Sequence, residues 1–249
     1  MILIGLTGSI GHGKSTLADG FMKATDKATH VETYQIVAEV AAGLHQHLQT
    51  IPAANDIPAI NAWLSSLPEI LAKVVHCDCD YKQIELTAED IQAHPEHYRK
   101  LFDYLDRLKA NPALAKTEIT ASNKEQYRPI LQWLGGYLVT HLDSGIWYKE
   151  IVRRAQSVAH TSTQLYVVSG LRFASDGDAI HQAGGKILEI VRPGASTLDA
   201  QDVTERERSQ IKPDSTVYND GTIEQLDSLA KKIWQDCQAD TLQATYHAA

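Results

Sequence analysis

Cysteines, long apolar runs and an excess of positive charge are all missing or scarce in this chain of 249 residues. Two of its three cysteines, Cys77 and Cys79, lie too close together for an easy disulfide, so with Cys237 they favour a reducing compartment. No apolar run reaches the ~20 residues that cross a bilayer, and the N-terminus lacks the charged leader and cleavage site of a signal peptide. We therefore expect a cytoplasmic protein with no membrane partner.

Acidic residues outnumber basic ones, 31 to 23, which gives a formal net charge of −8. This balance argues against a nucleic-acid polymer as partner, because non-specific binding to its backbone needs positive charge. A small phosphorylated ligand stays compatible, since it needs only a local cluster of Arg and Lys. The apolar share of 43% and the length predict one globular domain, residues 1–249, carrying an inserted lobe. The sequence does not decide the oligomeric state, so a homodimer stays open.

A phosphate-loop pattern, G-x-x-x-x-G-K-[ST], stands almost at the N-terminus. The apolar segment 1–6 before it predicts a buried strand, and the apolar spacing after it predicts a helix. The backbone N–H groups and the dipole of that helix favour an anion at its start. We predict that the whole motif binds nucleotide: Gly8, Ser9, Ile10, Gly11, His12, Gly13, Lys14, Ser15 and Thr16.

Each fixed position of this motif has a chemical reason. Glycines let the backbone curl closely around phosphates. Lys14 is predicted to reach the β- and γ-phosphates of a nucleotide as a catalytic residue, and the Ser15 hydroxyl to bind Mg²⁺. The alternative is a glycine-rich turn between strand and helix with an incidental lysine.

The next part of the chain predicts a strand over 29–34 followed by a helix. Glu32 and Tyr34 are candidate substrate contacts at the end of that strand, with a plain strand end as the alternative. Residues 50–125 contain five prolines between short helical patterns and no strand series, which predicts a mostly helical insertion. The segment 76–80, His-Cys-Asp-Cys-Asp, lacks a second ligand pair at zinc-site spacing and is interpreted as polar coil.

The last 120 residues alternate between helical and strand patterns. A helix begins near Pro129, with Arg128 at its start. Beyond it, the sequence predicts strands over 165–173, 186–191 and 215–218, helices over 176–183 and 223–237, and a frayed tail after Asp240. This alternation predicts an α/β fold, a doubly wound parallel sheet.

Four separated motifs point to one family. They are the phosphate loop, the segment 128–135 with Asp143 and Trp147, the segment 167–194, and Asp214 with the segment 218–221. In this order they resemble the phage-type deoxynucleoside monophosphate kinases, among the P-loop nucleoside monophosphate kinases, and more distantly dephospho-coenzyme A kinase. Residues 50–125 are not covered by the resemblance.

The resemblance implies transfer of the γ-phosphoryl group of ATP, with Mg²⁺, to the phosphate of a small nucleotide acceptor. It implies Arg128, Arg153 and Arg172 as acceptor-phosphate ligands and Arg192 as a catalytic residue that approaches the transferring group. It also implies Asp143 and Trp147 at the acceptor base or sugar, and Asn219 and Gly221 beside the adenine. The alternatives are surface or structural ion pairs for the arginines, core packing for Trp147, and a simple turn for Asn219 and Gly221. Arg154 is an alternative to Arg153. Arg206 and Arg208 either close over ATP or lie on a solvated helix face.

One departure from the family pattern concerns Gly170, where relatives usually carry an acidic residue that orients Mg²⁺ or the acceptor. Another carboxylate such as Glu32 substitutes for it, or the protein binds nucleotide and turns over poorly. Two further functions therefore stay open: a dephospho-coenzyme A kinase-like enzyme, which should want a carboxylate base near its acceptor hydroxyl, and an ATP-dependent binding module.

Overall fold

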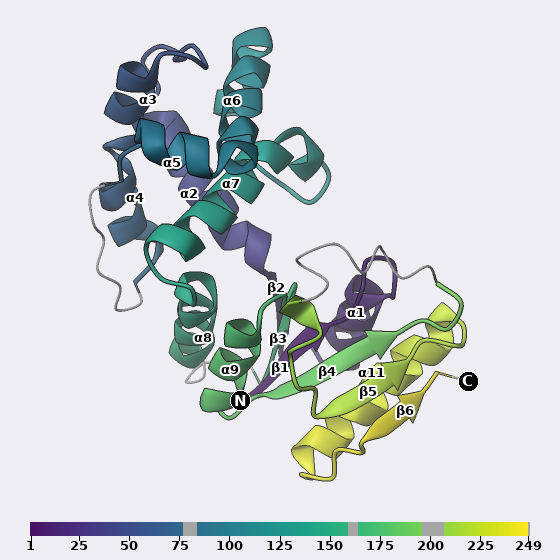
Figure 1. The fold of residues 1–249 in the computed structure, drawn as a ribbon. Coiled ribbons are helices and arrows are strands. Elements are labelled where there is room, and N and C mark those ends of the chain that lie inside the picture. The colour runs from purple at the N-terminus through teal and green to yellow at the C-terminus, as the bar shows by residue number, and fades with distance from the viewer. Residues whose placement is uncertain (77–83, 159–163, 196–206, 249) are drawn as a thin grey trace. The chain divides into compact units, whose positions relative to one another are not determined.

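The computed structural model describes residues 1–76, 84–158, 164–195 and 207–248. They divide into two compact units. Figure 1 shows the ribbon, coloured by residue number from the N-terminus to the C-terminus. The first unit, called the sheet unit, comprises residues 1–33 and 151–249, and the second, called the helical unit, comprises residues 34–150. The helical unit extends beyond the segment 50–125 at both ends.

The sheet unit contains a six-stranded, all-parallel sheet in the order β2-β3-β1-β4-β5-β6. The first strand of the chain, β1, therefore lies in the interior of the sheet, between β3 and β4. This order confirms the predicted doubly wound parallel sheet. The strands are β1 (Ile2–Thr7), β2 (Ala28–Glu32), β3 (Leu165–Ser169), β4 (Lys186–Val191), β5 (Ser215–Tyr218) and β6 (Thr245–His247).

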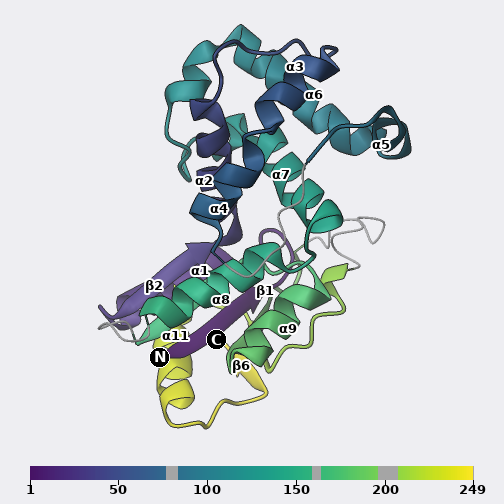
Figure 2. The same cartoon turned by 90° about the vertical axis from the view of Figure 1, so that its left-hand side faces the viewer.

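Helices cover both faces of this sheet (Figures 1 and 2). On one face, α1 (Lys14–Ala24) and α11 (Ile223–Gln238) pack on each other and enclose a core that includes Ile4, Leu6 and Phe21. On the other face lie α9 (Ala174–Gln182) and the second half of α8 (Ile146–Val158). Because successive side chains of a strand point to opposite faces, each interior strand needs apolar residues throughout, as β1 and β3 have.

The end of β3 differs from the prediction of a strand over 165–173. The strand stops at Ser169, because Gly170 has φ +97°, which no strand residue adopts. The prediction of strand 29–34 was also too long, since the helix α2 (Thr33–Gln46) already contains Tyr34. Tyr34 is therefore a helical residue and not the end of a strand.

The tail after Asp240 is ordered, which corrects the prediction that it frays. Residues 245–247 form β6, parallel to β5. The Ala248 backbone nitrogen donates to the Tyr218 carbonyl oxygen (3.0 Å), and the His247 ring stacks on the Tyr218 ring at 4.8 Å between centroids. The C-terminal residues thus complete the sheet.

The helical unit contains no strand among its described residues. Its core is rich in aromatic side chains, with Trp133, Tyr98, Tyr104 and Tyr127 fully buried. The further helices are α3 (Ile57–Leu64), α4 (Leu67–Val74), α5 (Ala88–Ala93), α6 (Pro95–Ala110) and α7 (Arg128–His141), with the 3-10 helices η1 (Pro112–Lys116) and η2 (Lys124–Gln126).

Candidate active site

The carboxyl ends of the parallel strands bring most of the predicted site residues of the sheet unit to one edge of the sheet. Residues that directly follow β1, β3, β4 and β5 are Gly8, Gly170, Arg192 and Asn219, and Glu32 ends β2. In doubly wound sheets this edge, beside the strand where the order reverses, is where ligands bind.

The segment Gly8–Gly13, called here the glycine loop, joins β1 to α1. Gly8 has φ +136°, and a Cβ atom at this position would lie 2.4 Å from the Ile190 carbonyl oxygen. No other residue type fits there without moving the backbone of β4. Gly13 caps α1 in the left-handed conformation and offers no side chain to the first N–H groups of the helix. These N–H groups therefore suit an external anion.

Lys14 begins α1 and folds back over the glycine loop. Its Nζ donates to the carbonyl oxygens of Gly8 (2.6 Å) and Ser9 (2.9 Å). The ammonium group is thus held at the loop, where the motif predicts phosphate. Ser15 and Ile10 are exposed, the latter by 65%, while Thr16 is half-buried.

Arg208 contacts the glycine loop from a distant part of the chain. Its guanidinium donates to the buried Ser9 hydroxyl (2.9 Å) and to the Glu189 carboxylate on β4 (3.3 Å). The Arg208 side chain is only 16% exposed, so it does not lie on a solvated helix face. Arg206 and the acidic residues before it lie outside the described residues.

Two further residues hold the glycine loop to neighbouring strands. The His12 Nδ1 atom lies 3.2 Å from the Ile190 carbonyl oxygen and 3.3 Å from the Arg192 backbone nitrogen. The Asn219 side chain donates to the His12 carbonyl oxygen (2.9 Å), and its backbone N–H donates to Val191 (2.8 Å). The loop is therefore connected to the ends of β4 and β5.

Asp176 is buried beneath the turn that carries Arg172. One carboxylate oxygen, Oδ2, accepts hydrogen bonds from the backbone N–H groups of Arg172 (2.8 Å) and Phe173 (2.9 Å). Burial raises the pKa of the Asp176 carboxyl to about 6, against the lowering effect of these two hydrogen bonds and of the Arg172 charge. Asp176 thus fixes the backbone of the turn, while the Arg172 side chain is exposed.

Gly221 is packed against the C-terminal strand, since a Cβ atom here would lie 1.8 Å from the Ala248 carbonyl oxygen. This contact gives Gly221 a structural reason to be glycine. The neighbouring Asp220 accepts hydrogen bonds from the His247 ring (2.9 Å) and the Ala248 N–H (3.0 Å). The turn after β5 is thus fixed by β6.

Glu32 is half-buried and pairs in register with Ser169 at the ends of β2 and β3. The Ser169 hydroxyl lies 2.8 Å from the His30 Nε2 atom. Arg153 and Arg154 are both half-buried on α8. Neither of these two arginines is favoured over the other by its burial.

The other predicted acceptor residues belong to the helical unit. Arg128 is exposed and donates to the Glu125 carboxylate (2.7 Å). Asp143 accepts from the Gly145 N–H (2.7 Å) and pairs with Lys149. Trp147 is buried, 5% exposed, and its Nε1 donates to the Gly135 carbonyl oxygen (3.1 Å), so part of its role is packing.

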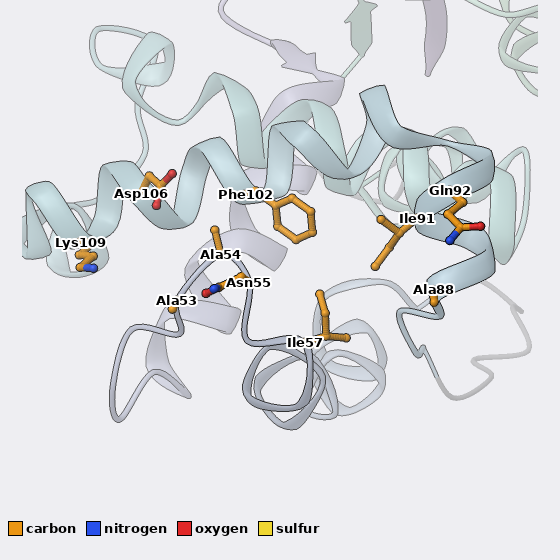
Figure 3. Close-up of a pocket in the computed structure, with 10 residues that line it drawn as sticks. All are labelled: Ala53, Ala54, Asn55, Ile57, Ala88, Ile91, Gln92, Phe102, Asp106 and Lys109. Carbon is orange, nitrogen blue, oxygen red and sulfur yellow. The ribbon is translucent and has the colours of Figure 1, made fainter.

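The helical unit also has an open cavity of about 620 Å³, drawn in Figure 3. Apolar side chains, including Ile57, Ile91 and Phe102, face this space. Asp106 and Lys109 are its only charged lining residues among those described. None of the residues predicted to bind the acceptor lines it, and Lys109 is the only cationic residue among its described lining residues.

The part of the chain that the structure describes also bears on metal binding and on membrane crossing. His, Cys, Asp and Glu side chains gather there in no group of three that could hold a metal ion. Of the segment 76–80, only His76 is described, and its backbone N–H donates to Glu150 (2.8 Å). Cys237 is a half-buried free thiol. Within the same residues, no helix combines the length and apolar character needed to cross a membrane.

Three contacts of this site were not predicted from the sequence: Arg208 with Ser9, Asn219 with His12, and Asp176 with the turn after β3. The first two join residues that are about 200 positions apart in the sequence. The third is local, because the spacing of Asp176 from Phe173 resembles a helix-capping pattern. That spacing was a local signal that could have been used.

An interior β1, a glycine loop between β1 and the first helix, and arginines after the strands of one sheet edge are features of phosphotransferases of the nucleotide-kinase type. The deoxynucleotide monophosphate kinase family matches residues 69–232, more than half of the chain. The chain belongs to this family, which confirms the predicted resemblance and the predicted kinase activity on deoxynucleoside monophosphates. The match does not include the glycine loop, so the two observations are independent. A search of curated proteins found no match.

Proposed function

We propose that ATP is the phosphoryl donor of this kinase and that the glycine loop binds its phosphates. The observation that carries the proposal is the position of the Lys14 ammonium group over the Gly8 and Ser9 carbonyl oxygens, at the N-terminus of α1. Phosphate oxygens accept hydrogen bonds from both kinds of donor. The whole motif from Gly8 to Thr16 forms this donor site.

Magnesium fits the start of α1, because Ser15 presents an exposed hydroxyl there and Mg²⁺ takes few protein ligands. When bound, the ion would neutralise part of the negative charge of the phosphates. Glu32, at the end of β2, is the carboxylate that we propose in place of the acidic residue missing at position 170. At Gly170 an acidic side chain would be strained, since the backbone φ is +97°.

For the acceptor we propose a phosphate site of arginines, which hold phosphate oxygens in pairs and keep their charge. Arg172 and Arg153 contribute from the sheet unit and Arg128 from the helical unit, which we propose as the acceptor-side lobe of a single kinase domain. Asp143 and Trp147 contact the base or sugar. Arg192 approaches the transferring group, and Asn219 and Gly221 lie beside the adenine.

Phosphoryl transfer requires mainly that the two phosphate groups are held in position and that their negative charge is neutralised. Two phosphate groups must be held in line while water is excluded, and no covalent intermediate with the protein is needed. Lys14 and Arg192 stabilise the charge that spreads over the transferring group. The arginines of the acceptor site offset the repulsion between the two anions.

The test is ADP formation from ATP and Mg²⁺ with each deoxynucleoside monophosphate in turn and with dephospho-coenzyme A. We expect turnover with at least one monophosphate and a loss of ~10²-fold or more in Lys14→Ala, since removing one charge-stabilising donor has effects of this size. Lys23→Ala is the matched control, because Lys23 lies on the same helix and only pairs with Asp227 at the surface. ADP formation that ignores the acceptor would contradict the proposal and indicate an ATPase.

A further inference from the structure

His12 is the one large ring in the glycine loop, and it is buried. Its side chain is 6% exposed, although it lies between two glycines in a loop that otherwise faces solvent at Ile10 and Gly11. A phosphate-binding motif requires no particular side chain at this position, because backbone N–H groups of the loop bind the phosphates. The ring therefore needs an explanation outside the motif.

The ring contacts backbone atoms at the C-terminal end of β4. The Nδ1 atom lies 3.2 Å from the Ile190 carbonyl oxygen and 3.3 Å from the Arg192 backbone nitrogen. One ring nitrogen cannot donate to the first and accept from the second at once. The tautomer of His12 thus selects whether the loop is bonded to Ile190 or to Arg192.

The other ring nitrogen, Nε2, is buried and has no hydrogen-bond partner among the described residues. A buried polar atom without a partner destabilises the folded state, so the ring is not explained by stability alone. An apolar side chain of similar size would fill the same space without that penalty. What the ring adds over such a side chain is the Nδ1 contact.

We propose that His12 is a positioning residue that sets the distance between the glycine loop and Arg192. The inference rests on the proposed role of Arg192 at the transferring group. In the tautomer whose Nδ1 accepts from the Arg192 backbone N–H, the ring joins the loop that holds the donor phosphates to Arg192 and keeps the guanidinium in register with the phosphates. His12 therefore acts on the transfer step more than on ATP binding.

Two isosteric variants test the role of Nδ1. The amide of Asn reaches the place of Nδ1, whereas the amide of Gln reaches the place of Nε2. We expect His12→Gln to lower kcat about tenfold with the ATP dissociation constant within about twofold, and His12→Asn to keep kcat within about threefold, because ~1.4 kcal/mol in a barrier is tenfold in rate. Equal losses in the two variants would overturn the proposal.

A double-mutant cycle tests whether His12 acts through Arg192. In the Arg192→Ala background, His12→Gln should change kcat less than twofold, since the group that it positions is gone. Additive losses would show that His12 acts elsewhere. Unfolding temperatures of all four proteins separate a positioning effect from a loss of folded protein.

A readout without catalysis distinguishes failure of this inference from failure of the proposed function. The backbone amide of Arg192 is observed by ¹H–¹⁵N NMR in the wild type and in both variants. We expect its exchange with solvent deuterium to be faster than in the wild type in His12→Gln and near the wild-type rate in His12→Asn. Equal exchange rates in both variants would refute the contact even if the kinase proves active, and the expected pattern would support it even if no acceptor is turned over.

Discussion

The glycine loop and the predicted acceptor residues of the helical unit are held by different kinds of contact. Around the loop, several partners are half-buried backbone oxygen atoms, as in the bonds from Lys14 and Asn219. In the helical unit, Arg128 and Asp143 pair with charged side chains at the surface. Exposed ion pairs contribute little to stability, whereas buried contacts to the backbone determine local geometry.

This difference separates a donor site with a fixed shape from acceptor residues that can exchange their partners. A side chain in an exposed pair loses little when it turns to a ligand instead. A loop that is bonded by the side chains of Lys14, Asn219 and Arg208 has little freedom to change. We therefore expect substitutions of the loop glycines to affect stability and ATP binding together, and substitutions of acceptor residues to affect the kinetics while the unfolding free energy changes little.

The largest expected effect comes from Gly8→Ala. The new Cβ would meet the Ile190 carbonyl oxygen at 2.4 Å while φ is +136°, so we expect a loss of ~4 kcal/mol in unfolding free energy and loss of ATP binding. Gly11→Ala is the control, because φ is +82° there but no atom lies within 4 Å, and we expect ~1 kcal/mol. Denaturant titration and a fluorescent ATP analogue measure both. Similar losses in the two variants would show that the loop is not held by β4.

A smaller effect is expected from the pH dependence of Asp176. The folded pKa of about 6 exceeds that of an unfolded Asp near 3.9, so the folded state binds the proton more tightly. The stability from the protonated carboxyl is complete below about pH 4 and is lost as pH rises through about 6.

Asp176→Asn removes this titration while leaving an oxygen to accept from Arg172 and Phe173. The unfolding free energy of the variant minus that of the wild type should therefore rise by up to ~3 kcal/mol between pH 4 and pH 7. This follows from a pKa difference of about two units at ~1.4 kcal/mol per unit. Denaturant titrations across this range give the difference. A difference that stays constant with pH would mean that Asp176 is ionised throughout.

The smallest stability effect is expected at Arg128, with a matched control at Arg99. Both arginines lie on helices of the helical unit and make exposed i,i+3 pairs, Arg128 with Glu125 and Arg99 with Glu96. Either change to Ala should alter the unfolding free energy by less than ~1 kcal/mol.

Only Arg128→Ala should raise KM for the monophosphate, by about tenfold, which corresponds to one charge-assisted hydrogen bond of ~1.4 kcal/mol. Steady-state kinetics with varied monophosphate measure this ratio. An unchanged KM, or the same rise in Arg99→Ala, would remove Arg128 from the acceptor site.

Patterns that are local in sequence predicted most elements of the fold. The glycine loop between β1 and α1, the strand β4 and the helix α11 follow from motif, apolar run and apolar spacing, since neighbouring residues decide these features. The two strand ends that were predicted too long, β2 and β3, depend on the backbone angles of one or two residues. Such ends are the least certain part of any pattern.

The last strand could not be predicted in this way. Residues 245–247 alternate between exposed and buried side chains, but three residues are too few to predict a strand, and β6 depends on pairing with β5 and on the bonds from Ala248 to Tyr218 and Asp220. The same holds for Arg208, whose charged segment is compatible with a solvated helix until the contact with Ser9 is seen.

The sequence by itself determined the class of protein, the glycine loop and the alternation of strands and helices, because each depends on residues within one short segment. The tertiary structure alone decided the strand order that places β1 between β3 and β4, and with it the contacts of the loop. His12 and Asn219 meet because parallel strands end at one edge, and Arg208 reaches the loop from the segment before β5. Their roles therefore depend on the packing of the whole sheet and on no local pattern.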